Sequence, residues 1–190
     1  DVASLIAPAV DRIFDFTAES GLLSILHSDI HMPFVKPEFR RLYFDQAVAL
    51  FRRHPNSTII WAHTGLGRVV QPVSDHLAML EEILADPGLK HVYFDISWDE
   101  VAKYVVATPD ATRQTTALIE KYPDRFLFGS DNVALTEPQA LFAVFNQYQP
   151  LWDALSPEAS EAVRKGNFAR LFDAAKVKVR SWEKTHPAPL

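Results

Sequence analysis

The stretch Thr58-Ile-Ile-Trp-Ala-His63 decides the fold, because it places a short apolar run directly before a polar residue. The same pattern recurs every 32 to 36 residues along the 190-residue chain, in Gly21–His27, His91–Asp95 and Arg125–Asp131. Each run is four to six residues long, is rich in aliphatic and aromatic side chains, and lacks a clean polar–apolar alternation. This pattern is typical of strands buried on both faces in a parallel sheet.

Helical patterns separate the four predicted strands. Apolar residues recur at helical spacing, with proline or glycine near the ends, in four main stretches: 8–20, 37–54, 72–86 and 109–122. Shorter helical stretches follow the last strand, at 137–147, 157–165 and 167–174. Consecutive strand–helix units at this period predict right-handed crossovers, and so an α/β fold with four parallel strands and flanking helices. We expect one domain over residues 1–174 and a short basic tail over residues 175–190.

Composition excludes several classes of protein. The chain carries 19 Lys and Arg against 24 Asp and Glu and is 48% hydrophobic, the balance of an ordinary globular protein. Its dispersed acidity argues against a nucleic-acid partner, and no apolar run approaches the roughly 20 residues that cross a bilayer. The absence of cysteine rules out disulfides, thiolate zinc sites and a cysteine nucleophile. The first residue is Asp1 rather than Met, and no signal peptide follows it. We therefore expect a chain that is processed or lacks upstream sequence. The expected location is the cytoplasm, with an exported form as the alternative.

The carboxyl ends of the predicted strands hold the candidate functional residues, because loops converge there in parallel α/β folds. These ends supply His27, His63, Asp95 and Asp131. Imidazole and carboxylate groups suit zinc or another divalent ion, whose bound water has a pKa lowered to about 7. An isolated strand-end histidine is often only structural, and Asp131 could instead cap a helix or turn. Because His27, His63 and Asp131 end three strands in the same frame of the repeat, we favour the functional interpretation.

The loops next to these residues allow alternatives. Asp95 either lines the pocket or accepts hydrogen bonds from backbone donors, and Trp98 in the same loop is a candidate substrate contact. The segment Gly65-Leu-Gly67-Arg68 lacks a dinucleotide-binding fingerprint, and its glycines favour a tight turn. Arg68 either binds a substrate carboxylate or forms a structural salt bridge. The other histidines lie off the strand ends, and we interpret them as structural: His31, His54, His76, His91 and His186.

Five segments, in order and over nearly the whole chain, resemble the amidohydrolase superfamily. The closest resemblance is to its amidohydrolase-related branch, which contains metal-dependent hydrolases and decarboxylases built on a TIM barrel. The segments are Ile25–Asp29, Ile60–Gly65, Tyr93–Trp98, Arg125–Asp131 and Gly166–Phe172. The resemblance implies that the chain is the C-terminal half of a TIM barrel, with barrel strands five to eight.

The same resemblance implies roles for the candidate residues. His27 and Asp131 would bind a divalent metal, zinc before any other, and Asp131 would also serve as the base for the water's proton. His63 would bind a second metal or polarise the substrate or the metal-bound water. The loop that contains Trp98 would shape the pocket of a small-molecule substrate, which Arg68 would also contact.

The sequence also departs from the family pattern. The His-x-His pair of the family's first strand has no counterpart here, and His27 with Asp131 alone gives fewer than the three protein ligands usual for catalytic zinc. We therefore expect the missing strands to belong to the same native polypeptide. The main hypothesis is hydrolysis of an amide, ester or lactone, with decarboxylation as the alternative within the family.

Two alternative hypotheses belong to other classes of protein. One is a non-catalytic half-barrel that serves as a binding or structural module. Such a module would self-associate as a homo-oligomer, because an open sheet leaves two unpaired edges. The other is a flavodoxin-like or Rossmann nucleotide binder, which the lack of a glycine-rich loop after the first strand disfavours. Neither nucleic acid nor a membrane is an expected partner.

Overall fold

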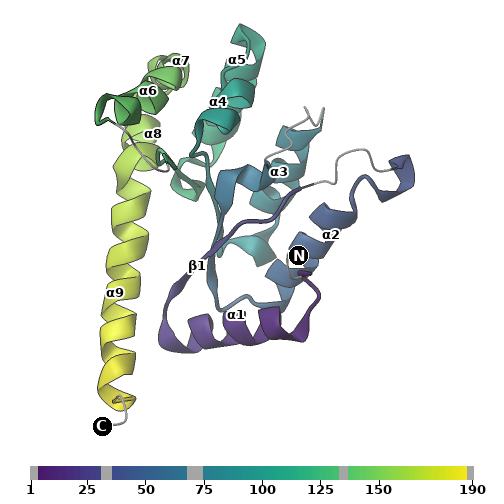
Figure 1. Ribbon diagram of the computed structural model, residues 1–190, viewed down its shortest axis with the longest axis vertical. Coiled ribbons are helices and arrows are strands. Elements are labelled where there is room, and N and C mark those ends of the chain that lie inside the picture. The colour runs from purple at the N-terminus through teal and green to yellow at the C-terminus, as the bar shows by residue number, and fades with distance from the viewer. Residues whose placement is uncertain (1–3, 31–35, 68–74, 133–136, 188–190) are drawn as a thin grey trace.

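A computed structural model describes residues 4–30, 36–67, 75–132 and 137–187. Within them, four parallel strands form one sheet in chain order: β1 (Leu23–Leu26), β2 (Thr58–Trp61), β3 (Val92–Asp95) and β4 (Phe126–Leu127). The predicted α/β fold with four parallel strands is confirmed (Figure 1). The last strand is shorter than predicted, because only its first two apolar residues pair with β3.

Helices connect the strands, as the sequence predicts. Helix α1 (Pro8–Ser20) precedes β1, and α2 (Leu42–Arg53), α3 (His76–Ala85) and α5 (Pro109–Lys121) lie in the successive connections. Two short helices have no counterpart among the predicted elements, α4 (Asp99–Val105) and α7 (Gln149–Ala154). The helices that follow β4, besides α7, are α6 (Gln139–Gln147), α8 (Pro157–Glu161), the π-helical turn η5 (Ala162–Gly166) and α9 (Asn167–Thr185).

The two faces of the sheet pack against different partners. On one face, alternate strand residues such as Trp61 and Phe94 join side chains of α2, α3 and α5 in the main hydrophobic core. On the other face, Ile60 and Leu127 pack with Leu171 of α9 in a smaller cluster. The face that packs against α2, α3 and α5 is therefore covered more completely than the face that packs against α9. Because successive residues of a strand point to opposite faces, the position of a residue in its strand decides which face it joins.

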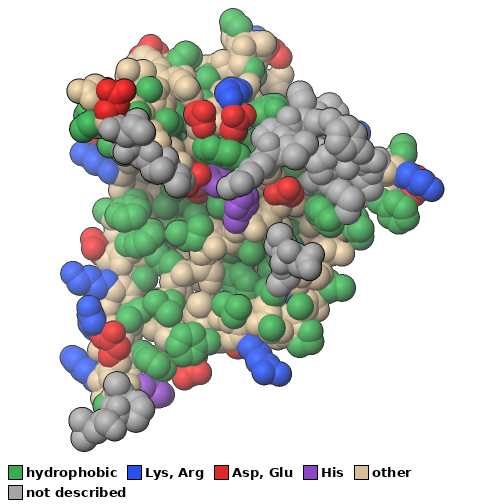
Figure 2. Space-filling view, in the orientation of Figure 1, with side chains coloured by type: hydrophobic (Ala, Val, Ile, Leu, Met, Phe, Trp, Pro, Cys, Tyr) green, Lys and Arg blue, Asp and Glu red, His purple; other side chains and the backbone are tan. Residues whose placement is uncertain are grey.

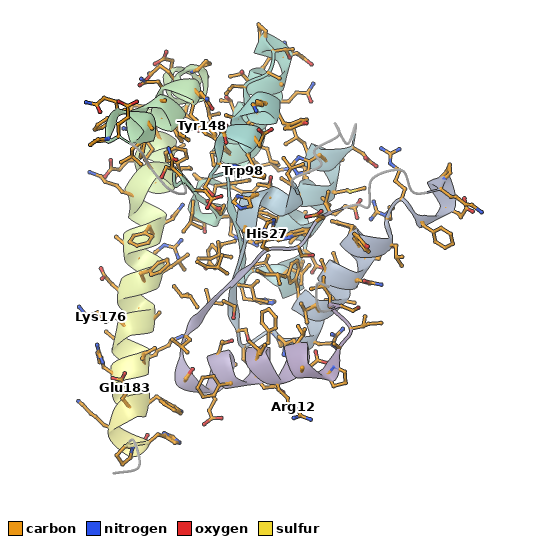
Figure 3. The ribbon with its side chains drawn as sticks, in the orientation of Figure 1. Arg12, His27, Trp98, Tyr148, Lys176 and Glu183 are labelled. Atoms are coloured by element: carbon orange, nitrogen blue, oxygen red, sulfur yellow. The ribbon has the colours of Figure 1, made fainter. Side chains whose placement is uncertain are left out.

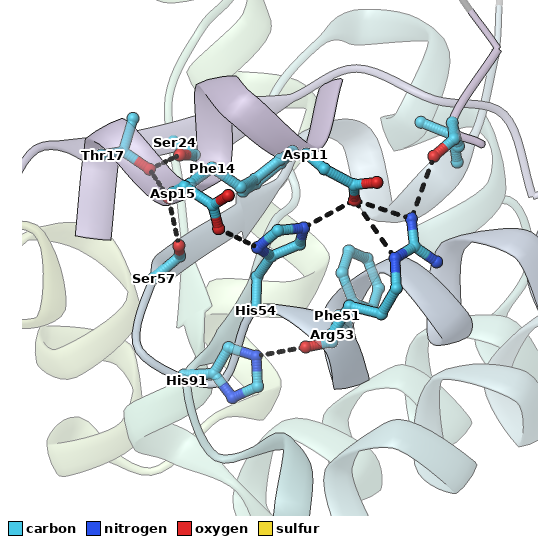
Figure 4. Close-up of polar contacts among 11 residues, drawn as sticks. Asp11, Phe14, Asp15, Thr17, Ser24, Phe51, Arg53, His54, Ser57 and His91 are labelled. Atoms are coloured by element: carbon cyan, nitrogen blue, oxygen red, sulfur yellow. Dashed lines mark hydrogen bonds and ion pairs between the residues drawn. The ribbon is translucent and has the colours of Figure 1, made fainter. Parts of the chain in front are cut away.

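A polar network joins α1 to the end of α2 (Figure 4). The imidazole of His54, which is 6% exposed, lies between two carboxylates of α1. Its Nε2 is 2.8 Å from Asp11 Oδ1, and its Nδ1 is 3.2 Å from Asp15 Oδ1. Hydrogen bonds from His54 and from Arg53 hold the pKa of the Asp11 carboxyl below its usual value of 3.8. His54 therefore has the structural role that we expected.

Helix α9 differs from the prediction of a basic tail after residue 174. The same helix continues without a break to Thr185, so the predicted boundary falls inside it. Trp182 packs edge-on against Phe16 of α1, with ring centroids 5.6 Å apart, and its Nε1 donates to Glu19. The lysines and arginines that suggested a solvated tail therefore belong to a helix that rests on α1 through its aromatic residue. Among the described residues, no helix has both the length and the apolar character that a membrane span requires.

Candidate active site

The candidate residues from different strands meet at one end of the sheet. His27 follows β1, His63 lies in the 3₁₀ turn η2 (Ala62–Gly65) after β2, and Asp131 follows β4 by four residues. Together with Trp98, they line a cleft of about 670 Å³. Figure 2 shows histidine side chains bordered by acidic ones on this face, and Figure 3 shows His27 and Trp98 at the same end of the sheet. The structure thus brings His27, His63, Trp98 and Asp131 together in one cleft.

The imidazole of His63 occupies the centre of this cluster, and the side chain is 9% exposed. Its ring lies edge-on to that of His27 at a centroid distance of 5.0 Å, and at 5.1 Å from that of Trp98. Its Nε2 is 3.6 Å from Oδ2 of Asp131, whose side chain is 42% exposed toward solvent. This distance exceeds that of a direct hydrogen bond but leaves the two groups close enough to act on the same atom. His63 and Asp131 therefore form a close imidazole–carboxylate pair in the cleft.

Behind His63 lies a second carboxylate, which does not line the cleft. Asp95 accepts hydrogen bonds from the Ser97 hydroxyl at 2.5 Å, from the Ser97 N–H at 3.0 Å and from the His63 N–H at 3.4 Å. Burial raises the pKa of the Asp95 carboxyl, while the hydrogen bonds from Ser97 oppose that rise. Of the two interpretations of Asp95, the structure supports the one in which it satisfies backbone donors. Ser97, by contrast, was not among the candidates that the sequence offers.

Backbone strain is concentrated at the site. Among the described residues, positive φ angles outside glycine occur at His63 (55°), Thr64 (52°), Trp98 (92°) and Asp131 (45°). Three of these residues line the cleft, and the fourth follows His63. Such conformations cost on the order of 1–3 kcal/mol each and cluster at active sites, where the surrounding structure holds them. The strain therefore supports a functional interpretation of the cleft.

The glycines after His63 allow close packing of its turn. Gly65 has a φ of 74°, and a Cβ there would come within 2.7 Å of the Trp61 ring. At Gly67, a Cβ would overlap the Asp29 carboxylate. These two positions explain the glycines as requirements of a tight turn, as their spacing in the sequence predicts. Arg68, the predicted substrate contact in the same segment, lies outside the described residues.

The donor set fits a divalent metal in type but not in number. Imidazole and carboxylate groups are suitable ligands for zinc, and His27, His63 and Asp131 all line the cleft. Within the ranges that the structure describes, however, no group of three or more such residues is close enough to hold an ion. We therefore derive no catalytic step from a bound metal.

These features define the class of the protein as half of a TIM barrel, with a polar site at the carboxyl ends of its strands. Residues 4–174 match the family described as Amidohydrolase. The chain therefore belongs to the amidohydrolase family, as the resemblance of its strand-end segments indicated.

Solved structures share the fold at low sequence identity. An uncharacterized TIM-barrel protein from Bordetella bronchiseptica has a TM-score of 0.61 and 15% identity, with 92% of this chain and 53% of that chain covered. A zinc-bound amidohydrolase from Burkholderia multivorans has a TM-score of 0.55 and 17% identity, with 91% and 61% covered. 4-Oxalomesaconate hydratase from Rhodopseudomonas palustris has a TM-score of 0.53 and 17% identity, with 97% and 55% covered.

The chain thus spans little more than half the length of these solved structures. At identities of 15–17% the likeness concerns the fold alone. No curated protein matches the sequence.

Proposed function

We propose that this chain carries the proton-transfer part of a hydrolase site that acts on an amide, ester or lactone. The observation that supports the proposal is the Asp131–His63 pair, whose Oδ2 and Nε2 atoms are 3.6 Å apart in a cleft at the carboxyl ends of the strands. Hydrolysis requires a group that removes a proton from water and a group that polarises the bond under attack. A carboxylate and an imidazole on opposite sides of one small space can divide these two tasks.

Asp131 is the better placed of the two to accept the proton of the attacking water. Its side chain is 42% exposed, so water reaches the carboxylate, whereas the His63 side chain is 9% exposed and is held by its neighbours. His63 would then receive this proton at Nε2 and pass it toward the substrate oxygen on which negative charge develops. The lining residues Asn132 and Gln147 add amide groups that can bind a polar substrate.

A divalent metal, with zinc as the first candidate, is part of this proposal. His27 and Asp131 are the residues of this chain that we propose as its ligands. Because the described residues provide too few ligands, further ligands would come from outside them.

A substrate screen tests the proposal. The protein is incubated with and without added zinc, against a panel of amides, esters, lactones and phenolic acids, and the products are separated by chromatography. We expect hydrolysis of at least one of the first three classes, with kcat lowered about 100-fold or more in His63→Gln. The matched control is His186→Gln, which makes the same substitution at an exposed residue after the end of α9 and should leave kcat unchanged.

Two results would contradict hydrolysis. One is a folded protein that turns over no member of the panel, with or without zinc. The other is release of carbon dioxide from a phenolic acid without any hydrolysis, which would assign the decarboxylase activity instead.

A further inference from the structure

We infer that Asp95 and Ser97 are positioning residues that hold the neutral imidazole of His63 as its Nδ1–H tautomer. The inference deepens the proposed function and rests on it for its catalytic meaning, because it decides which ring nitrogen is free to act in the cleft. Neither residue lines the cleft, so both would act through His63.

The first step concerns the direction of the hydrogen bonds at Asp95. Three donors face its carboxylate: the Ser97 N–H, the Ser97 O–H and the His63 N–H. Hydrogen bonds to the charged form of a carboxyl favour that form, which offsets part of the cost of burial. The Ser97 hydroxyl therefore directs its proton to Asp95 Oδ2.

The second step concerns the atoms that surround Nδ1 of His63. The Ser97 carbonyl oxygen and the Ser97 Oγ each lie 3.3 Å from Nδ1, and Asp95 Oδ2 lies 3.8 Å away. The carbonyl and the carboxylate can only accept. Because the single proton of the Ser97 hydroxyl already goes to Asp95, Oγ also can only accept. Nδ1 thus has two acceptors at 3.3 Å, whereas the Asp131 carboxylate lies 3.6 Å from Nε2, so the closer acceptors favour the proton on Nδ1.

The third step is the consequence at the other ring nitrogen. Nε2 of the neutral ring then has a lone pair, and it is this atom that faces Asp131 Oδ2 at 3.6 Å. The free nitrogen can accept a proton or bind a cation in the cleft, whereas the opposite tautomer would offer an N–H there. In other catalytic histidines, too, the hydrogen-bond partner of one ring nitrogen sets the tautomer and so the form in which the other nitrogen acts.

The fourth step is the anchoring of the Asp95–Trp98 loop. The hydroxyl of Tyr148 contacts the carbonyl oxygens of Ile96 and Trp98, the latter at 2.8 Å. Burial raises the pKa of Tyr148, so this hydroxyl keeps its proton and remains a donor. Ser97 lies between the two anchored carbonyls, so its carbonyl and hydroxyl are held against His63.

Heteronuclear NMR of the full protein with isotope-labelled histidine tests the inference. Spectra are taken at about pH 8, above the ordinary imidazole pKa of about 6.5, and the His63 signals are assigned by their loss in His63→Gln. We expect the Nδ1–H tautomer in the wild type, the opposite of the form that free histidine prefers in water. In Asp95→Asn, the new amide donates to Ser97 Oγ and turns the hydroxyl toward Nδ1, so the Nε2–H signal should increase.

Asp99→Asn is the matched control, since it removes a carboxylate at the start of α4 that has no hydrogen bond to Ser97 among those described. It should leave the tautomer as in the wild type. A wild-type His63 in the Nε2–H form would overturn the inference without any variant. An unchanged Nδ1–H form in folded Asp95→Asn would overturn the role of Asp95.

The catalytic meaning of the tautomer has its own readout. Once a substrate is known, Asp95→Asn should lower kcat about 10- to 100-fold at unchanged KM. A normal kcat in this variant would remove the catalytic role of Asp95. Because NMR detects the tautomer without any substrate, the result of this test does not depend on whether the proposed hydrolysis is observed.

Discussion

His63 shows how single residues prepare the site. Its backbone adopts a φ of 55°, its N–H donates to Asp95, and its ring lies between His27 and Trp98. Interactions on several sides thus hold a conformation that the residue would not adopt alone. The same turn depends on Gly65, two residues later, for its tight path.

Gly65→Ala should destabilise the protein strongly. The new residue would have to adopt a φ of 74°, and its Cβ would come within 2.7 Å of the buried Trp61 ring. Backbone strain and overpacking together predict a loss of about 3 kcal/mol in the free energy of unfolding. Urea denaturation measures the loss, with Gly88→Ala as the control, because its φ is not positive and its nearest contact is the movable Asp86 side chain. Equal stability of the two variants would show that the turn tolerates a side chain.

Among single residues, the sequence predicts those at the strand ends better than it predicts the residues that hold them in place. His27, His63 and Asp131 are recognisable because a polar residue recurs after each apolar run. Ser97 carries no such signal, since a serine two residues past a strand is common in loops. The positive φ angles of Trp98 and Asp131 could not be predicted from the sequence either, because neither side chain requires such an angle.

At the scale of secondary-structure elements, α9 is tied to the strands by Asn167. This side chain is 3% exposed, and its Nδ2 donates to the carbonyl oxygens of Pro123 and Phe126 at 2.7 and 2.8 Å. One amide thus connects the start of the last helix to the start of β4.

Asn167→Ala should cost about 2–3 kcal/mol of the free energy of unfolding, because two buried carbonyl oxygens lose their donor. The measurement is again urea denaturation. Asn146→Ala on the exposed surface of α6 is the matched control and should change stability by no more than about 0.5 kcal/mol. A loss at residue 167 no larger than that of the control would contradict the link.

His91 gives the connection between α2 and β3 a pH dependence. Its Nε2 lies 3.0 Å from the Phe51 carbonyl oxygen, and burial lowers its pKa below 6.5. As the pH falls through 6.5, the unfolded chain takes up the proton first, so folding stability is present above this pH and is lost below it. His91→Gln keeps a donor but cannot titrate. Between about pH 7.5 and pH 5.5, the wild type should lose more stability than this variant in denaturant titrations, and parallel curves would contradict the prediction.

Elements with a strong apolar period were predictable, whereas short ones were not. The spacing of apolar residues in α1, α2 and α5 identifies them from sequence, but α4 and α7 have too few turns to show a period. The segment after residue 174 suggested a solvated tail, because lysine and arginine side chains recur along it. The segment is instead helical and packs on α1 through the contact of Trp182 with Phe16, which joins residues far apart in the sequence.

At the scale of the whole molecule, the sheet is open. Among the described strands β1 and β4 each have a single neighbour, and Ile25 in the middle of β1 is 65% exposed. The chain covers 53% of the TIM-barrel protein whose fold it shares. The repeat in the sequence predicted the four strand–helix units, and the resemblance to the amidohydrolase superfamily implied that they are half of the eight in a TIM barrel.

We propose that this chain, on its own, pairs with a second copy of itself through the β1 edge, since exposed apolar edge strands tend to associate. Sedimentation velocity should show dimers that increase with protein concentration. Ile25→Lys should shift the distribution toward monomer, whereas Phe142→Lys, at a similarly exposed position on α6, should not. A monomer at every concentration would contradict this proposal without affecting the site.

The measurement that tests the central claim most directly is kcat for Asp131→Asn on whichever substrate the screen identifies. Asparagine keeps the size of the side chain but cannot accept the proton of water. Loss of a general base lowers rates by about 10²- to 10⁴-fold, so we predict a fall in this range. The control Asp173→Asn, on the exposed surface of α9, should stay close to the wild type. A folded Asp131→Asn variant with unchanged kcat would contradict the assignment of this cleft as the hydrolytic site.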